Sequence, residues 1–155
     1  MHLQSDMVKQ MVSAMLVCGI CFLPLPLFAA DAGIIKTVKG QVQIERADSS
    51  HAVKVGDFVR AGDRVNVKGE GSIGISLKDE TLLSIGPNST LVIDNFDYDP
   101  TTREGRVETS IVRGTLRFVT GLIGKLNPKG IKVMTPTATC GIRGTDFIVD
   151  VPDER

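Results

Sequence analysis

Short stretches in which apolar and polar side chains alternate recur along the chain after the first thirty residues. Residues 73–78 read Ile-Gly-Ile-Ser-Leu-Lys, and residues 38–45 show a similar alternation interrupted by Gly40. A period of two places every second side chain on the same face of an extended segment, so each stretch predicts a β-strand with one buried face. Comparable apolar runs lie at 81–85, 91–93, 131–133 and 147–149.

Residues 112–118 form a further predicted strand, whose alternation assigns side chains to two faces. The period of two predicts that Val112, Leu116 and Phe118 share the buried face with Gly114, while Arg113, Thr115 and Arg117 point the other way.

The fold class follows from these strands and from the turns between them. Residues 55–59, Val-Gly-Asp-Phe-Val, are echoed by Ala-Gly-Asp-Arg-Val at 61–65, where each Gly-Asp suits a turn and each final valine suits a buried strand position. The 16 glycines and 7 prolines weigh against long helices. We therefore predict one all-β domain over residues 33–150, with residues 151–155 as a tail. It is either a compact two-sheet sandwich or roll, or a short β-solenoid.

The N-terminal residues 1–30 differ from the rest and predict a secretory signal peptide. Lys9 supplies a positive charge, residues 11–28 carry no charge, and small residues near 30–32 offer a cleavage site. The apolar run of about 18 residues is near the lower limit for spanning a bilayer. An uncleaved membrane anchor is the alternative, and a cleaved signal predicts a periplasmic or secreted protein.

The cysteines limit the redox chemistry of the exported chain. Cys18 and Cys21 leave with the signal, so Cys140 alone remains and no intramolecular disulfide can form. Free cysteine is among the most buried residue types, so we expect Cys140 to be buried rather than open to cross-linking.

The charges are balanced overall but unevenly placed. An acidic stretch at residues 79–99 is followed by a basic one at 103–143. These stretches either neutralise each other or leave a basic face for an anionic polymer or a lipid surface. The residues of this candidate basic face are Arg113, Arg117, Lys125, Lys129 and Lys132.

The residues that usually carry catalysis or hold cofactors do not form a recognisable set. Residues 69–74 match the Gly-x-Gly-x-x-Gly string, but a strand follows where a dinucleotide site needs a helix. His51 lies in a polar loop without a recognisable nucleophile, and acidic pairs such as Asp94 and Asp97 more often form turns. We expect no catalytic residues, no metal site and no cofactor.

The stretch from Thr135 to Val149 is the strongest local feature. Two glycines bracket an arginine there and suggest a bend that holds Arg143 and Asp146 in fixed places. These two residues either pair with each other and fix the last strand, which we favour, or bind a ligand. The predicted motif residues are Gly141, Arg143, Gly144, Thr145, Asp146 and Phe147.

Four segments in a fixed order resemble a known family, the FecR-type domain. They are 40–42 with the two Gly-Asp turns, 77–89 (Leu-Lys-Asp-Glu-Thr-Leu-Leu-Ser-Ile-Gly-Pro-Asn-Ser), 112–118 (Val-Arg-Gly-Thr-Leu-Arg-Phe), and 135–138 leading into 142–147 (Ile-Arg-Gly-Thr-Asp-Phe). The resemblance covers about residues 33–149.

This resemblance implies an exported, non-enzymatic module for contact with an envelope protein or a cell-wall polymer, and no nucleic acid. The family's named members are inner-membrane regulators that sense a loaded transporter and control a sigma factor. Only ten residues precede the apolar segment here, so we expect no cytoplasmic sigma-binding part and no stable membrane insertion after cleavage. The alternative is an accessory of envelope signalling that contacts a transporter or a transmembrane sigma-factor regulator.

Overall fold

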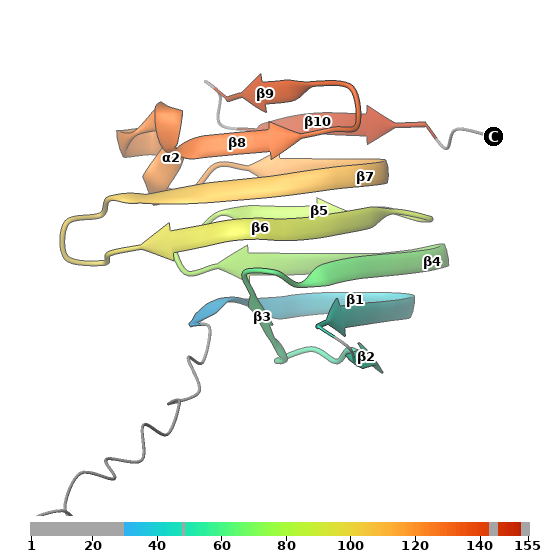
Figure 1. Cartoon of the computed structure of the whole chain (residues 1–155). Coiled ribbons are helices and arrows are strands. Elements are labelled where there is room, and N and C mark those ends of the chain that lie inside the picture. The colour runs from blue at the N-terminus through green and yellow to red at the C-terminus, as the bar shows by residue number, and fades with distance from the viewer. Residues whose placement is uncertain (1–29, 48, 143–145, 153–155) are drawn as a thin grey trace, which may run out of the picture.

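The computed structural model describes residues 30–47, 49–142 and 146–152, and in this part the chain forms one ten-stranded sheet folded over on itself (Figure 1). The strands are β1 (Asp31–Arg46), β2 (Ser49–Ala52), β3 (Phe58–Arg60), β4 (Arg64–Leu77), β5 (Leu82–Ile85), β6 (Thr90–Tyr98), β7 (Gly105–Val119), β8 (Ile131–Met134), β9 (Thr139–Gly141) and β10 (Asp146–Val151). Two short helical turns, α2 (Leu122–Leu126) and η1 (Pro128–Gly130), join β7 to β8. The all-β prediction is confirmed, and the architecture is the roll.

Three long strands, β1, β4 and β7, each take part in both layers of the roll. Their first and second halves pair with different neighbours. In the first layer the order is β2, β1, β4, β6, β7, β8 and β9; in the second it is β3, β1, β4, β5, β7 and β10. Figure 1 shows β6 and β8 of the first layer in front of β5 and β10 of the second.

Glycines stand where these long strands pass from one layer to the other. The φ angles of Gly40 in β1, Gly69 in β4 and Gly114 in β7 are +66°, +55° and +83°, a region that other residues adopt at a cost. The corners of β1 and β4 also lie against each other, because a Cβ on Gly40 would lie only 2.9 Å from the Cα of Gly71. Glycine thus permits both the bend and the close approach.

The core lies between the inner faces of the two layers. Buried apolar side chains alternate along the strands of both, including Ile44, Val65, Leu91 and Ile111 from the first layer and Ile35, Ile75, Leu83, Leu116 and Phe118 from the second. The buried Phe118 ring stacks on Phe147 of β10 with the ring centroids 5.1 Å apart. Full burial of such a side chain stabilises a fold by about 1.5–3 kcal/mol.

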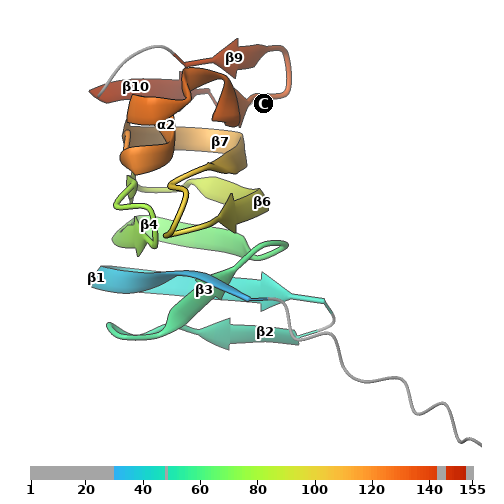
Figure 2. The same cartoon turned by 90° about the vertical axis from the view of Figure 1, so that its left-hand side faces the viewer.

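The α2 segment closes one side of the roll, as Figure 2 shows from that side. Ile123 of α2 is fully buried, and the Leu122 N–H donates to the carbonyl oxygen of Asp79 at 2.7 Å. The chain then returns as β8, which runs parallel to the first half of β7. No helix in the described ranges is long and apolar enough to cross a membrane. The predicted signal segment lies almost wholly outside those ranges.

The predicted phase of residues 112–118 is wrong at Val112, which is 40% exposed. In the pairing of β6 with β7, Leu91 faces Ile111 but Thr90 faces Arg113. Val112 is therefore an extra residue, a β-bulge that shifts the alternation by one position. Leu116 and Phe118 lie on the buried face as predicted, beyond the bulge and the Gly114 corner.

The predicted Gly-Asp repeat is confirmed as two equivalent turns. The N–H of Gly56 donates to the carbonyl of Ile35 at 2.9 Å, and that of Gly62 donates to the carbonyl of Ile93 at 2.7 Å. Val59 and Val65, which follow the turns, are both fully buried. Each turn therefore docks on a neighbouring strand and aims the next valine into the core.

Thr109 places a hydroxyl inside the core without a hydrogen-bond partner among the described residues. An unsatisfied buried hydroxyl costs about 1–3 kcal/mol, and valine has nearly the same shape. We expect Thr109→Val to raise the free energy of unfolding by about 1 kcal/mol in denaturant titrations. Thr90→Val is the control, because the Thr90 hydroxyl donates to Asn66 Oδ1 at 3.0 Å and its removal should destabilise. A loss of stability in Thr109→Val would contradict the prediction.

Candidate functional site

The C-terminal end of the roll presents two open strand edges. β9 pairs with β8 and β10 pairs with β7, and the other edge of each has no strand partner in the described part of the chain. Both strands lie at the top of the stack in Figure 1. An unpaired edge offers backbone N–H and C=O groups to a further strand.

The backbone groups that β9 turns outward follow from its hairpin with β8. The N–H of Thr135 donates to the carbonyl of Ala138 at 2.8 Å, so these two form a hydrogen-bonded pair at the turn. Antiparallel pairs alternate between hydrogen-bonded and non-hydrogen-bonded types. Thr139 and Gly141, which face Met134 and Lys132, are therefore non-hydrogen-bonded positions whose backbone groups point to the open edge.

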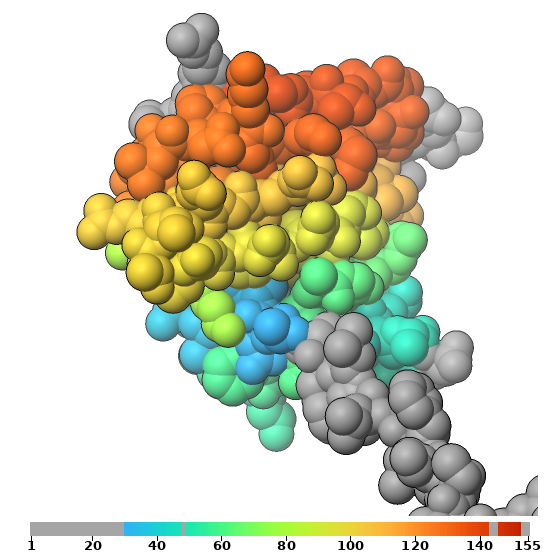
Figure 3. All heavy atoms as spheres, turned by 60° about the vertical axis from the view of Figure 1, so that its left-hand side comes forward, coloured from blue at the N-terminus to red at the C-terminus, as the bar shows by residue number. Residues whose placement is uncertain are grey.

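A shallow groove of about 500 Å³ lies beside this edge. Its lining is mostly apolar, with two lysines, and consists of Pro128, Lys129, Ile131, Lys132, Gly141 and Ile142. Figure 3 shows the part of the surface to which α2, η1 and β8 contribute, in orange, above the yellow surface of β6 and the start of β7. The edge and the groove together resemble the two parts that strand-accepting sites use, backbone groups and a side-chain pocket.

Cys140 is exposed, so the expected burial of this cysteine is wrong. It faces the fully buried Val133 across the β8–β9 ladder, and directly opposed residues lie on the same face of a sheet. The Cys140 position thus belongs to the inner face. It stays exposed because β9 is the outermost strand of its layer.

The motif residues predicted around the bend fall partly outside the described ranges. Gly141 lies in β9, and Asp146 and Phe147 begin β10, whereas Arg143, Gly144 and Thr145 are not described. The predicted pairing of Arg143 with Asp146 therefore stays a prediction.

Arg117 is a partner of Asp146 that sequence reasoning missed. Its Nε and Nη2 donate to the two carboxylate oxygens of Asp146 at 3.0 and 2.6 Å. The hydrogen bond and the charge of Arg117 lower the pKa of Asp146, and those of Asp146 raise the pKa of Arg117. Because Arg117 faces Ile148 across the ladder, the pair ties β7 diagonally to the start of β10.

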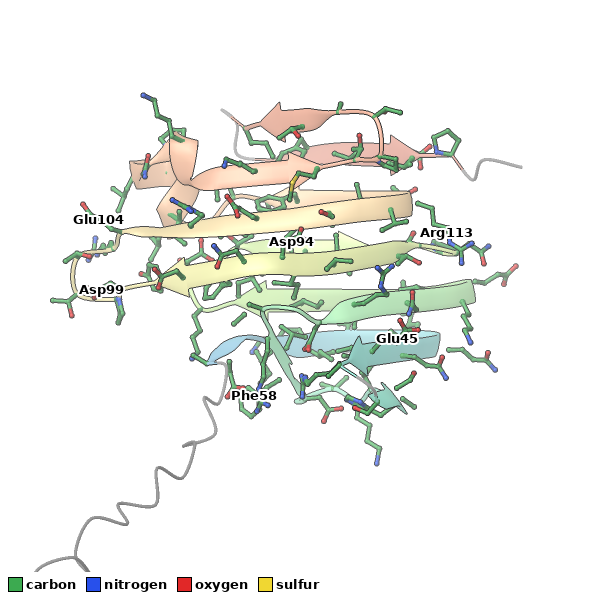
Figure 4. The ribbon with its side chains drawn as sticks, in the orientation of Figure 1. Glu45, Phe58, Asp94, Asp99, Glu104 and Arg113 are labelled. Carbon is green, nitrogen blue, oxygen red and sulfur yellow. The ribbon has the colours of Figure 1, made fainter. Side chains whose placement is uncertain are left out.

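The five residues of the candidate basic face are spread over both layers and the helical turns. Lys132 lies on β8, with its Nζ 3.1 Å from Glu108 Oε1, and it lowers the pKa of Glu108 through that hydrogen bond. Arg117 lies on the second half of β7, while Lys125 ends α2 and Lys129 lies in η1. Figure 4 shows Arg113 at the end of the roll opposite Glu104. Of the five, only Lys129 and Lys132 line the groove.

The acidic pair Asp94 and Asp97 is exposed on β6, and Figure 4 labels Asp94. Asp94 Oδ2 accepts from the Ser110 hydroxyl at 2.6 Å. Asp99 Oδ1 accepts from the N–H of Thr101 at 2.7 Å, and this bond lowers the pKa of Asp99. Asp94 thus makes a cross-strand contact, and Asp99 makes a local turn contact. No group of three or more metal-ligating side chains is found within residues 30–47, 49–142 and 146–152.

Comparison with known proteins gives one family match. Residues 63–155 match the family model described as FecR protein. No curated protein matches the sequence. Among solved structures, a chain titled "Cell surface anchoring domain" is similar, with 29% identity, a TM-score of 0.38, and coverage of 39% of this chain and 82% of that one.

Proposed function

Because the chain belongs to the FecR protein family, we propose that it is an exported, non-enzymatic module that binds or scaffolds other proteins in the bacterial envelope. The family is a regulatory one, which supports a role in contact rather than in catalysis. The predicted signal segment supports export to the periplasm or the cell surface.

The open β9 edge beside the groove is the observation that carries this proposal. The backbone groups of Thr139 and Gly141 provide hydrogen bonds to an extended segment, whatever its sequence. Ile131 and Ile142 in the groove favour an apolar side chain on that segment, and Lys129 beside them favours a carboxylate. The partner in this proposal is therefore a protein with an exposed strand, and a cell-wall polymer is the weaker candidate.

Contact at this edge can be tested by photo-crosslinking from the exposed Cys140. The chain carrying a thiol-linked photoprobe at Cys140 is mixed with an envelope extract, and the adducts are identified by mass spectrometry. We expect specific protein adducts that decrease at least tenfold in Thr139→Pro, because proline removes an outward N–H.

Thr139→Val is the matched control, since it keeps the N–H and should keep the adducts. Thermal unfolding of both variants shows whether the fold is intact. Adducts that are equal in Thr139→Pro and in the wild type would refute strand acceptance at β9. Among the adducts, a transporter or a transmembrane sigma-factor regulator would favour envelope signalling, whereas a surface or wall protein would favour scaffolding.

A further inference from the structure

The outer face of the second layer carries apolar side chains that the described part of the chain leaves uncovered. Leu82 is 45% exposed and Ile148 is 66% exposed. Ladder partners form rows across this face. One row begins at β3 and is Phe58, Ile34, Ser76, Leu82, Val119 and Asp146, and the next begins at β1 and is Thr37, Gly74, Ser84, Arg117 and Ile148.

The middle of this face allows another surface to approach closely. Gly74, Ser76 and Ser84 lie between the larger side chains of the two rows, and their side chains are absent or small. Small residues let another packed surface approach the backbone of this face closely.

The charges of this face have opposite signs at its two edges. Lys39 pairs with Ser72 at the β1 side, and Asp150 pairs with Thr115 at the β10 side. Gly86 lies between Ser72 and Thr115 in this row, and its N–H donates to the carbonyl of Thr115. Asp150 accepts a hydrogen bond from the Thr115 hydroxyl at 2.7 Å, and neither Lys39 nor Asp150 has an ion pair with another described residue.

From this arrangement we infer that the outer face of the second layer binds a second copy of the chain, face to face. In the rows of Thr37 and Lys39 the strand order is β1, β4, β5, β7, β10, with β5 at its centre, and only the row of Ile34 extends further, to Phe58 of β3. A two-fold axis along β5, in the plane of the interface, reverses this order in the second copy. It then brings Leu82 against the second copy's Leu82, and Lys39 against the second copy's Asp150.

The same axis sets the row of Thr37 against its own reversed copy. Ile148 meets the second copy's Thr37, and Arg117, already neutralised by Asp146, meets the second copy's Gly74. A partner of uniform charge would leave one edge of the face unmatched or repelled. A second copy in this orientation matches both edges, which is why it is favoured over other occupants.

The size of the face predicts a weak and reversible dimer. Five strands about 4.8 Å apart and about six residues long cover roughly 400 Å² on each copy. A total near 800 Å² lies below the roughly 1,200–2,000 Å² of stable specific interfaces and within the range of weak, transient ones. We expect a dissociation constant on the order of 10–100 μM.

Sedimentation velocity of the full chain over about 1 μM to 1 mM tests this inference. The wild type should pass from monomer to dimer in that range, and Leu82→Lys should remain monomeric because it places two like charges on the axis. Val112→Lys is the matched control, since Val112 is similarly exposed on the bulge of β7 and away from this face. It should dimerise like the wild type.

Exchanging the charges of Lys39 and Asp150 gives a second readout, because a variant that fails to fold would not be restored by the second substitution. Lys39→Asp and Asp150→Lys should each weaken the dimer by about three- to tenfold, and the double variant should restore it. A monomeric wild type at 1 mM overturns the inference. A dimer that survives Leu82→Lys also overturns it, and so does a double variant that dimerises no better than the single variants. A dimer that is lost in Thr139→Pro but kept in Leu82→Lys overturns it too, because that result places the contact at the β9 edge.

Discussion

Replacing Asp63 by alanine is expected to lower the free energy of unfolding by about 2–4 kcal/mol. Its carboxylate is fully buried and accepts from Nε and Nη2 of Arg46 at 2.7 and 2.6 Å. It also accepts from the N–H of Arg60 at 2.9 Å. Removing one partner of a buried ion pair costs about 3–5 kcal/mol, and solvent at the Arg46 side, where the side chain is 32% exposed, reduces that figure.

The first Gly-Asp turn provides the control for this measurement. Asp57 occupies the same place in its turn and accepts from the N–H of Lys54 at 2.8 Å, and no arginine of the described ranges forms an ion pair with it. Asp57→Ala should therefore cost less than about 1 kcal/mol, the value of one exposed hydrogen bond. Equal losses in the two variants, measured by denaturant titration, would show that the turn matters and that the ion pair does not.

The second large effect is expected for Gly114→Ala, which should destabilise the protein by more than about 3 kcal/mol. The φ angle of +83° alone costs a residue with a Cβ about 1–2 kcal/mol. The added Cβ would also overlap the Ser89 hydroxyl and lie 2.7 Å from the Ser89 Cα. That hydroxyl accepts from the N–H of Thr115 at 2.9 Å, so moving it breaks a contact that holds the corner.

Gly56→Ala separates the cost of the positive φ angle from the cost of the overlap with Ser89. Gly56 has a φ of +96° but open space within 4 Å of the added Cβ, so only the backbone term remains. We expect a loss of about 1–2 kcal/mol for Gly56→Ala. If both glycine variants lose the same amount in thermal or denaturant unfolding, the contact with Ser89 contributes nothing.

The alternation of side chains predicted most of the strands but not their length. Residues 38–45 and 73–78 are parts of β1 and β4, which have 16 and 14 residues. A glycine within an alternating stretch usually predicts the end of a strand. Here Gly40, Gly69 and Gly114 turn the chain while its pairing continues, which depends on the neighbouring strand and not on local sequence.

The candidate site was harder to predict because it depends on register and on position in the stack. The contact of Arg117 with Asp146 follows from the pairing of β7 with β10, across 29 residues of sequence. The exposure of Cys140 follows from the outermost place of β9, which a residue type cannot indicate. The Gly-Asp repeat was predictable because its turns and the burial of Val59 and Val65 are local features.

The three long strands also have a consequence for how the molecule comes apart. Because β1, β4 and β7 each pass through a glycine corner into the other layer, the layers share covalent backbone at three places. When one layer opens, it loosens strands that also form the ladders of the other layer. A partner that pulls on β10 loads β7, and through it both layers at once. We therefore expect the two layers to unfold together, in one cooperative transition.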